Sequence, residues 1–313
     1  MKNKFKRFIF ILLCFIFVFK SVNANEPFIF NVTEIEILEN GNQINGYKGG
    51  TATSEDGSTI TAENFYYNKL TNILETTGNV KYFDKIKNII IKADKAIYLK
   101  NEEKIFTIGN SKAVSDNNTI TASNLEYDKI KNVFEAKKNV IIFDFEKDTT
   151  IYADEITYLK NEEQIFTEGE TKALVENKYK FNSEDVSYFR NSDDIFSQKK
   201  SSVEDDSGNI YKLNNFSYNI DKELLKGKIV SVLAKVENGK FDQYYFSEGF
   251  FNFKDKSYLA KETKIKSHKD IFGDKNHDPR IYGSSSSSDL DKTVVNNGIF
   301  TSCKLNDNCP PWS

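Results

Sequence analysis

The residue types that catalyse reactions are scarce in this chain. Its 313 residues contain two histidines, His268 and His277, and both lie near the C-terminal end. Ser–His–Asp and Cys–His sites need a histidine as general base, and residues 25–267 contain none. We therefore expect that the protein is not an enzyme.

One segment of the chain partly matches the residue spacing of a metal-binding loop. Asp274, Asn276 and Asp278 begin like a calcium-binding loop. Pro279 stands where that loop has its glycine, however, and Ser285 stands where it has its final glutamate. We expect no metal site and no cofactor.

Two aspartates recur at equivalent positions. Asp94 and Asp154 are separated by 60 residues and have similar neighbours. A catalytic role is one interpretation of this recurrence. A turn or bend explains it better, because short polar side chains bond to nearby backbone groups and each repeat needs one such bend.

The first 24 residues have the order of a secretory signal peptide. Residues 1–7 carry four basic and no acidic residues, residues 8–19 are an apolar run of twelve, and residues 22–24 include small residues suited to cleavage. A helix of that run spans about 18 Å, too short for a hydrocarbon core of about 30 Å. We expect an exported protein whose remaining cysteines, Cys303 and Cys309, are oxidised. A local and an intermolecular disulfide both remain open.

The charge balance excludes one class of partner. Five of the 43 basic residues and none of the 46 acidic residues lie in residues 1–24, so the rest of the chain has a net charge near −8. Binding to nucleic acid requires a basic surface that offsets the phosphates. We expect no nucleic-acid partner.

The rest of the chain is repetitive. Residues 60–113 align with residues 120–173 without a gap, and the Tyr-Leu-Lys-Asn-Glu-Glu of residues 98–103 returns at 158–163. Each block divides again at an offset of 31 residues. Repetition with this period indicates supersecondary units that stack side by side. Eight units start at Phe30, Ile60, Ile91, Ile120, Ile151, Phe181, Tyr211 and Phe246.

The units have apolar or small residues at positions n, n+2, n+5 and n+7, except that Glu248 stands at n+2 of the unit that starts at Phe246. The step of three between the two pairs would place them on opposite faces of a straight strand. A bulge or bend at the polar residue in that step, such as Glu63 or Ser123, gives them one common face. With a second strand at the apolar pair about 13 residues after n, the units predict an all-β fold of about sixteen antiparallel strands.

The bent strands are expected to form two sheets that face each other across an apolar interior. That interior is either an ordinary filled core or an open groove. The residues predicted to line it are Ile60, Ala62, Phe65, Tyr67, Ile91, Ala93, Ile97, Ile120, Ala122, Leu125, Ile151, Ala153, Ile156, Phe181 and Val186.

The repeated motif resembles a known domain. The pattern Ile-x-Ala-Asp/Glu-x-x-x-Tyr, followed by an apolar pair and then Gly-Asn-Val, is similar to the OstA (organic solvent tolerance) domain over about residues 28–267. This domain is shared by periplasmic bridge proteins of the LptA type and by the N-terminal part of lipopolysaccharide assembly proteins of the LptD type. The resemblance implies a β-jellyroll with an open apolar groove that holds the acyl chains of lipid A, while the sugars of lipopolysaccharide project outward.

The resemblance also implies that such domains dock edge to edge, a form of strand addition. The first unit is the expected docking edge. An edge strand protected from pairing by Glu34, Glu36 and Glu39 is the alternative. The docking residues would be Phe30, Val32, Ile35 and Ile37.

The C-terminal segment distinguishes the two kinds of relative. Residues 284–288 are serines, residues 300–303 read Phe-Thr-Ser-Cys, and residues 311–312 read Pro-Trp. This resembles the connection between the OstA domain and the barrel of LptD-type proteins. We therefore expect a signal peptide at 1–24, an OstA-like domain at 25–268, and at 269–313 a linker with a flexible serine run and the start of a barrel-proximal region.

The resemblance has further implications for partners and location. An LptD-type chain truncated before its barrel is the expectation, with a free-standing LptA-like bridge, or a structural or adhesive β-repeat protein without lipid, as alternatives. The implied partners are lipopolysaccharide, an LptA-type bridge protein and, if the barrel exists, an outer-membrane lipoprotein, at the periplasmic face of the outer membrane. In LptD-type proteins a cysteine at the position of Cys303 or Cys309 pairs with a cysteine near the end of the barrel. A disulfide partner that was lost with the barrel is therefore a third alternative for Cys303 and Cys309.

Overall fold

The computed structural model describes residues 27–236, 239–273 and 277–304, and nearly all of its regular structure is β-strand. The predicted signal peptide and Cys309 lie outside the described residues. The elements are β1 (Phe28–Leu38), the 3-10 helix η1 (Glu39–Gly41), β2 (Gln43–Ser54), β3 (Thr59–Ala62), β4 (Asn64–Asn68), β5 (Ile73–Asp84), β6 (Ile89–Leu99), β7 (Lys104–Val114), β8 (Asn118–Asp128), β9 (Val133–Asp144), β10 (Thr149–Leu159), β11 (Gln164–Val175), β12 (Tyr179–Glu184), β13 (Ser187–Phe189), β14 (Asp194–Glu204), β15 (Ile210–Asn219), β16 (Leu224–Lys235), β17 (Phe241–Asn252), β18 (Ser257–Lys266), β19 (Arg280–Ser288), β20 (Thr293–Asn296) and β21 (Ile299–Thr301).

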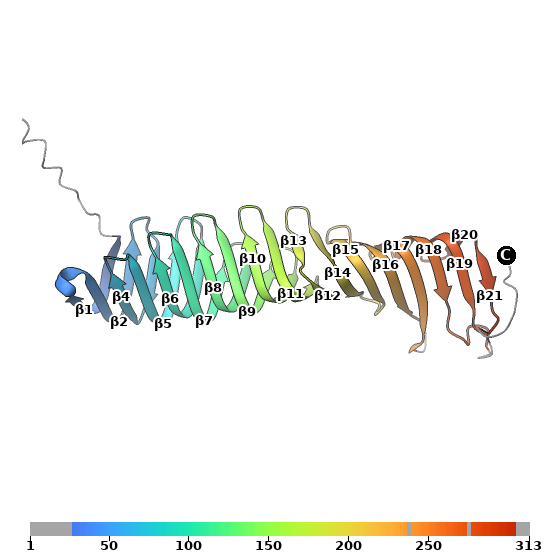
Figure 1. Ribbon diagram of the computed structural model, residues 1–313, viewed down its shortest axis with the longest axis horizontal. Coiled ribbons are helices and arrows are strands. Elements are labelled where there is room, and N and C mark those ends of the chain that lie inside the picture. Colours follow the sequence, from blue (N-terminus) through green and yellow to red (C-terminus); the bar gives the residue numbers. More distant parts are fainter. Residues whose placement is uncertain (1–26, 237–238, 274–276, 305–313) are drawn as a thin grey trace, which may run out of the picture.

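The strands form one continuous antiparallel meander. The long strands pair in chain order, so that β5 pairs with β6, β6 with β7, and so on toward the C-terminus. The short strands β20 and β21 both pair with β19. Figure 1 shows the strands following one another along the long axis of the molecule. The predicted all-β fold of antiparallel strands is confirmed. Because β3 and β4 line up along β5 as one interrupted strand, and β12 and β13 do so along β14, β1–β18 amount to the sixteen predicted strands.

Each long strand bends near its middle, as the step of three predicted. The pairing of β6 with β7 shifts register between Lys92 and Lys95, and that of β10 with β11 shifts between Ala153 and Glu155. On both sides of the bend in β6 the same face is buried, with Ile91 1% exposed before it and Tyr98 1% exposed after it. In a straight strand the apolar residues before and after the bend would lie on opposite faces. The bulges therefore bring them onto one common apolar face.

The bent strands fold into two layers that enclose this face. Aromatic rings from halves on opposite sides of a bend touch across the interior: the centroids of Phe28 and Tyr98 are 5.6 Å apart, and those of Phe181 and Tyr218 are 5.0 Å apart. The bends join the layers along one edge, and the turns between strands lie at the strand ends. Row 1 denotes turns 55–58, 85–88, 115–117, 145–148, 176–178 and 205–209; row 2 denotes turns 69–72, 100–103, 129–132, 160–163, 190–193, 220–223 and 253–256.

The serine run corrects one expectation. Instead of a flexible linker, residues 284–288 belong to β19, which pairs along β18 and continues the sheet beyond the repeats. The Oγ of Ser286 lies 2.7 Å from the Oγ of Thr263, and Ser286 is buried. A run of serines has no apolar alternation, so backbone pairing with an existing sheet edge is what makes it a strand. The pairings of β19 with β20 and β21 extend the sheet further.

Membrane-spanning helices are not part of the described fold. Within residues 27–236, 239–273 and 277–304, the structure contains no helix with the length and apolar character needed to cross a bilayer.

Glycines at the bends allow a direct test of the bulge geometry. Gly78 and Gly169 have φ of +80° and +76°, which costs an alanine about 1–2 kcal/mol. A Cβ on Gly78 would also lie 2.8 Å from the Cβ of Glu63, whereas one on Gly169 meets nothing within 4 Å. We predict that Gly78→Ala lowers the free energy of unfolding more than Gly169→Ala, as measured by urea denaturation followed by circular dichroism. Equal losses of unfolding free energy in the two variants would contradict the close approach of Gly78 to Glu63.

Candidate functional site

The residues predicted to line the interior come together in one core. All of them except Ile97 are less than 9% exposed and belong to a single buried cluster or border it. Ile97 is the exception because the bulge in β6 turns Ala96 and Tyr98 inward and Ile97 outward. The n+5 position of the unit that starts at Ile91 is Ala96, so Ile97 was placed one residue off.

The interior is closed over most of its length. Tyr82 and Tyr98 touch from opposite layers with their ring centroids 6.2 Å apart, and Phe65 and Ile105 are fully buried. An apolar face is present as predicted, but along these strands its two halves pack against each other, as in a filled core.

A cavity opens in the interior near the C-terminal end of the repeats. It has a volume of about 180 Å³ and lies between β15, β16, β17 and β18. Its walls include the rings of Tyr211, Phe246 and Phe251, and its mouth includes Ser207 and Lys256 from the two rows of turns. A dry apolar cavity of about 150 Å³ is large enough for benzene. The space therefore suits a small part of an apolar ligand without any rearrangement.

A line of buried tyrosines follows the edge of the interior where the turns lie. Each points its hydroxyl at a polar group of a turn: Tyr67 at Asn72 (2.8 Å), Tyr158 at Glu163 (3.0 Å) and Tyr211 at Asp205 (3.0 Å). Burial raises the pKa of Tyr158, and the neighbouring Glu163 raises it further, so its hydroxyl stays protonated and donates. These rings mark the boundary between the apolar interior and the polar turns.

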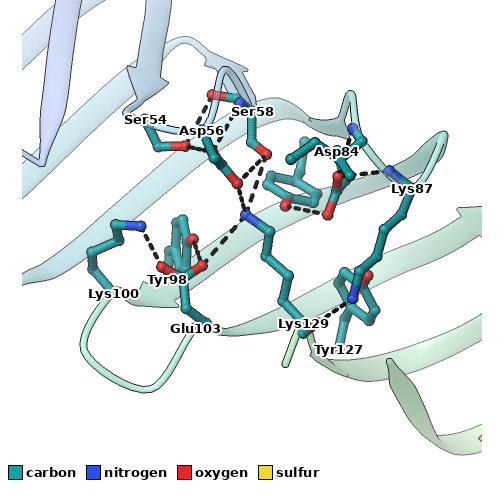
Figure 2. A network of polar contacts seen from close by, with 12 residues as sticks. Ser54, Asp56, Ser58, Asp84, Lys87, Tyr98, Lys100, Glu103, Tyr127 and Lys129 are labelled. Atoms are coloured by element: carbon teal, nitrogen blue, oxygen red, sulfur yellow. Dashed lines mark hydrogen bonds and ion pairs between the residues drawn. The ribbon is translucent and has the colours of Figure 1, made fainter. Parts of the chain in front are cut away.

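The two rows of turns contact each other through charged side chains. Lys129 of row 2 extends to row 1, where its Nζ pairs with Asp56 and lies 3.3 Å from the Oγ of Ser58. The same Nζ is 3.4 Å from Glu103 of row 2. Figure 2 shows Lys129 between these groups, with Lys87 of row 1 donating to the backbone carbonyl of Lys129. The contacts join turns that are 73 residues apart in sequence.

A second cluster of charges joins the rows farther along. The Nε of Arg190 in row 2 lies 2.6 Å from Asp144, at the end of β9 beside row 1, and Arg190 also pairs with Glu163. Tyr188 donates to the same Asp144 carboxylate at 3.0 Å. Arg190 and Asp144 have side chains that are 6% and 2% exposed. A pair this well buried is screened little by salt, and the loss of either partner leaves an uncompensated charge.

Asp56 and Glu103 of the first cluster are held in their charged forms. Burial alone would raise the pKa of Asp56, but hydrogen bonds from Lys129 and Ser54 lower it far below its usual value. Burial would likewise raise the pKa of Glu103, and hydrogen bonds from Lys100 and Tyr98 lower it. For Arg190 of the second cluster burial lowers the pKa, and the bond to Asp144 raises it by more. These three side chains are charged at neutral pH.

The structure does not test the calcium-loop interpretation, because Asp274 and Asn276 lie outside the described residues. The described residues contain no group of three or more His, Cys, Asp or Glu side chains placed to hold a metal ion. The Nδ1 of His268 pairs with Asp242 at 2.8 Å beside the sheet. Asp94 lies at the bend of β6 and accepts a hydrogen bond from Asn110, which supports the bend interpretation. Cys309 lies outside the described residues, so a local disulfide, an intermolecular disulfide and a lost partner all stay open for Cys303 and Cys309.

The charged contacts between the rows were missed at the sequence level. The pentapeptide Asp-Lys-Ile-Lys-Asn occurs at 84–88 and again at 128–132, and both copies form turns. The fourth residue of the first copy, Lys87, donates to the backbone carbonyl of Lys129, the second residue of the other copy. The side chain of Lys129 extends instead to Asp56 in the turn 55–58. The repeated pentapeptide was the available signal, but the pattern does not say which lysine faces the opposite row.

Comparison with known proteins gives little for this chain. No protein-family model matches the sequence, and no curated protein matches it. Among solved structures, the chain is similar to LptH of Pseudomonas aeruginosa, the LptA-homologous periplasmic component of the lipopolysaccharide transport device. The sequence identity is 13% and the TM-score 0.34, over 37% of this chain and 85% of LptH.

The tyrosine line predicts a contrast between two conservative substitutions. Tyr158→Phe removes a hydrogen bond to Glu163 and is expected to lower the free energy of unfolding by about 1 kcal/mol. The buried hydroxyl of Tyr218 has no hydrogen-bond partner among the described residues, so Tyr218→Phe is expected to leave stability unchanged or to raise it. Urea denaturation of both variants measures the difference. A larger loss for Tyr218→Phe would contradict this assignment of the hydroxyls.

The pairing of Lys129 with Asp56 predicts a pH dependence. Because the pKa of Asp56 is lower in the folded than in the unfolded state, its pair with Lys129 stabilises the fold above the unfolded pKa of about 4, and this is lost as pH falls below that value. Lys129→Met should therefore be less stable than wild type at pH 5–7, with the difference narrowing by pH 3. Urea midpoints at each pH measure it. The exposed neighbour Lys131, substituted by Met, is the control, and a pH-independent loss at Lys129 would refute the coupling.

Proposed function

We propose that this protein transports lipopolysaccharide across the periplasm by holding the acyl chains of lipid A between its two β-layers. The observation that carries the proposal is the continuous apolar interior, which extends along all the repeats and is bounded at the turns by polar contacts. The layers can therefore separate at the turns without breaking a strand pair. The resemblance of the repeat motif to the OstA domain supports the same function.

The energetics of the interior suit hydrocarbon. Each buried methylene is worth about 0.8 kcal/mol, so an acyl chain inserted between the layers replaces contacts of similar strength between the layers themselves. The cavity between β15 and β18 is the place where such replacement begins at the least cost, because Tyr211 and Phe246 already line an unfilled space there. The bound lipid would keep its polar groups at the turns. The proposed role is binding and transport, without catalysis.

The sheet edges provide the proposed docking surfaces. In the described part of the chain β1 pairs with β2 alone, and its other edge is unpaired. Phe30 and Val32 pack partly against the core, whereas Ile35 and Ile37 are 53% and 63% exposed. An unpaired edge with exposed apolar residues suits the addition of a strand from a second OstA-type domain, here a bridge protein of the LptA type. Lys48 pairs with Glu34 beside this edge, which leaves the protected-edge alternative to experiment.

The finer assignment follows from the C-terminal segment. We propose the LptD type, with the described sheet at the periplasmic face of the outer membrane and an outer-membrane lipoprotein as partner of any barrel. The Phe-Thr-Ser-Cys element supports this type, and in the structure it begins in β21, paired to β19. A free-standing bridge of the LptA type is the alternative within the same function.

One observation favours a second candidate function. The packed interior of β1–β14 is what a structural or adhesive repeat protein would have, because such a protein needs a dry core and free edges. The two functions differ in whether lipid reaches the inner face. Assembly that is independent of lipid, with no lipid contact at inner positions, would establish the structural role.

Photo-crosslinking distinguishes the two functions. We predict that p-benzoylphenylalanine in place of Phe65 or Phe246 captures lipopolysaccharide on irradiation, because both side chains face the interior. The same residue in place of Tyr152, which is 43% exposed on the outer face, should capture at least tenfold less. The measurement is the yield of lipid-linked protein on a gel stained for lipopolysaccharide. Capture from Tyr152 alone would refute the proposed function.

A further inference from the structure

We propose that the charged contacts between the two rows of turns form a latch that keeps the interior closed, and that the interior opens first at β15–β18, where the latch is missing. This inference rests on the proposed function and adds how and where the interior opens. The latch consists of the Lys129 cluster with Asp56, Ser58 and Glu103, and of the Arg190 cluster with Asp144 and Glu163.

The position of these contacts makes them a latch. Lys129 of row 2 pairs with Asp56 of row 1, and Arg190 of row 2 pairs with Asp144 beside row 1, so these two pairs connect the two layers at the edge away from the bends. Lys147 of row 1 adds a further connection to Asp193 of row 2 at 2.9 Å. Strand pairing within a layer is untouched when these contacts break, because they involve side chains and one carbonyl of a turn. Their loss releases the turns and leaves each layer intact.

The strength of the connections decreases toward the C-terminus. The charged clusters extend from Asp56 to Asp193, and Tyr179 donates to Glu223 just beyond them. In the described residues after Glu223, no ion pair joins the two rows. Their contact there is that of Lys256 with the Oγ of Ser207, 3.4 Å apart and exposed.

The cavity lies where the connections are weakest. Ser207 and Lys256 stand at its mouth, and beneath them Tyr211 and Phe246 line the open space. Under the charged clusters the interior is filled, with Tyr82 and Tyr98 in contact across it. Beside the cavity Tyr211 and Phe251 also touch, with ring centroids 5.1 Å apart, and the open space lies next to this contact. The interior is open where the connections between the rows are weak, and it is filled where buried ion pairs join them. The two layers therefore separate first at β15–β18 and then progressively toward the N-terminal strands.

The test compares two latch variants with a matched ion pair elsewhere. Lys129→Met with Asp56→Asn, and Arg190→Met with Asp144→Asn, remove both charges of the pair that joins the rows, so neither of its partners is left as an unpaired ion. Glu103 keeps its pair with Lys100, and Glu163 keeps the hydrogen bond from Tyr158. The control is Lys137→Met with Glu155→Gln, which removes a pair of 2.9 Å between adjacent strands of one layer. Circular dichroism establishes that each full-length variant is folded. Because the two latch pairs are independent, the test can still be made with one double variant if the other fails to fold.

Two measurements report on the latch. Spin labels at Ile86 of row 1 and Ile130 of row 2, both more than 70% exposed, give the distance between the rows. Stopped-flow fluorescence with a dansyl-labelled fatty acid gives the rate at which an amphiphile enters. We expect the latch variants to widen the distance distribution and to take up the probe about tenfold faster, a factor equal to about 1.4 kcal/mol. The control should match wild type in both.

The direction of opening is tested by the time course of capture. With benzophenone at Phe246 or Phe65, lipopolysaccharide should be captured first at Phe246, beside the cavity, and later at Phe65, and the delay should shrink in the Lys129 variant. Equal times at the two positions, or latch variants that match the control while wild type binds lipid, would overturn the latch and leave the proposed function intact. A wild type and variants that all fail to take up probe or lipid would overturn both.

Discussion

The fold depends on one geometric constraint: each strand must bury the same face on both sides of a bend. Side chains alternate along a strand, so a bend without a register shift would send the second half of the apolar pattern to the solvent. The bulge at Lys92–Lys95 and its equivalents add the odd residue that restores parity. With parity restored, a single antiparallel meander can enclose a core between its own two halves.

This construction leaves the two edges of the layered structure chemically different. At the bends the layers are covalently continuous, and Asn79 and Asn110 accept the left-handed backbone that the bulges need. At the turns the layers are separate, and only side chains hold them together. Apolar attraction alone is non-directional and would allow the layers to slide, whereas Arg190 and Lys129 fix which turn of one row faces which turn of the other. The ion pairs thus set the alignment of the layers as well as their closure.

The sequence predicted the parts of the structure that repeat locally. The spacing of Ile91, Ala93 and their equivalents determined the strands, the bends and the inward face, because burial and backbone parity act within a few residues. Ile97 was misplaced because the bulge position had to be known to one residue. The charged clusters were missed because Lys129 meets Asp56 across 73 residues, and no local pattern encodes which turns of two layers become neighbours. β19 was missed because its pairing with β18 and its short side chains take the place of an apolar pattern.

The meander also has a consequence for how the chain acquires its structure. Because neighbouring strands of the sheet are also neighbours in sequence, each new pairing closes a short turn, and the loop-closure entropy is small at each step. Such a chain can nucleate at any well-formed hairpin and grow outward one strand at a time, as in a one-dimensional lattice. Stability then accumulates with length, and the terminal strands, with a neighbour on one side alone, are the first to fray. Synthesis from the N-terminus suits this order of assembly, because each new strand arrives next to the edge on which it will pair.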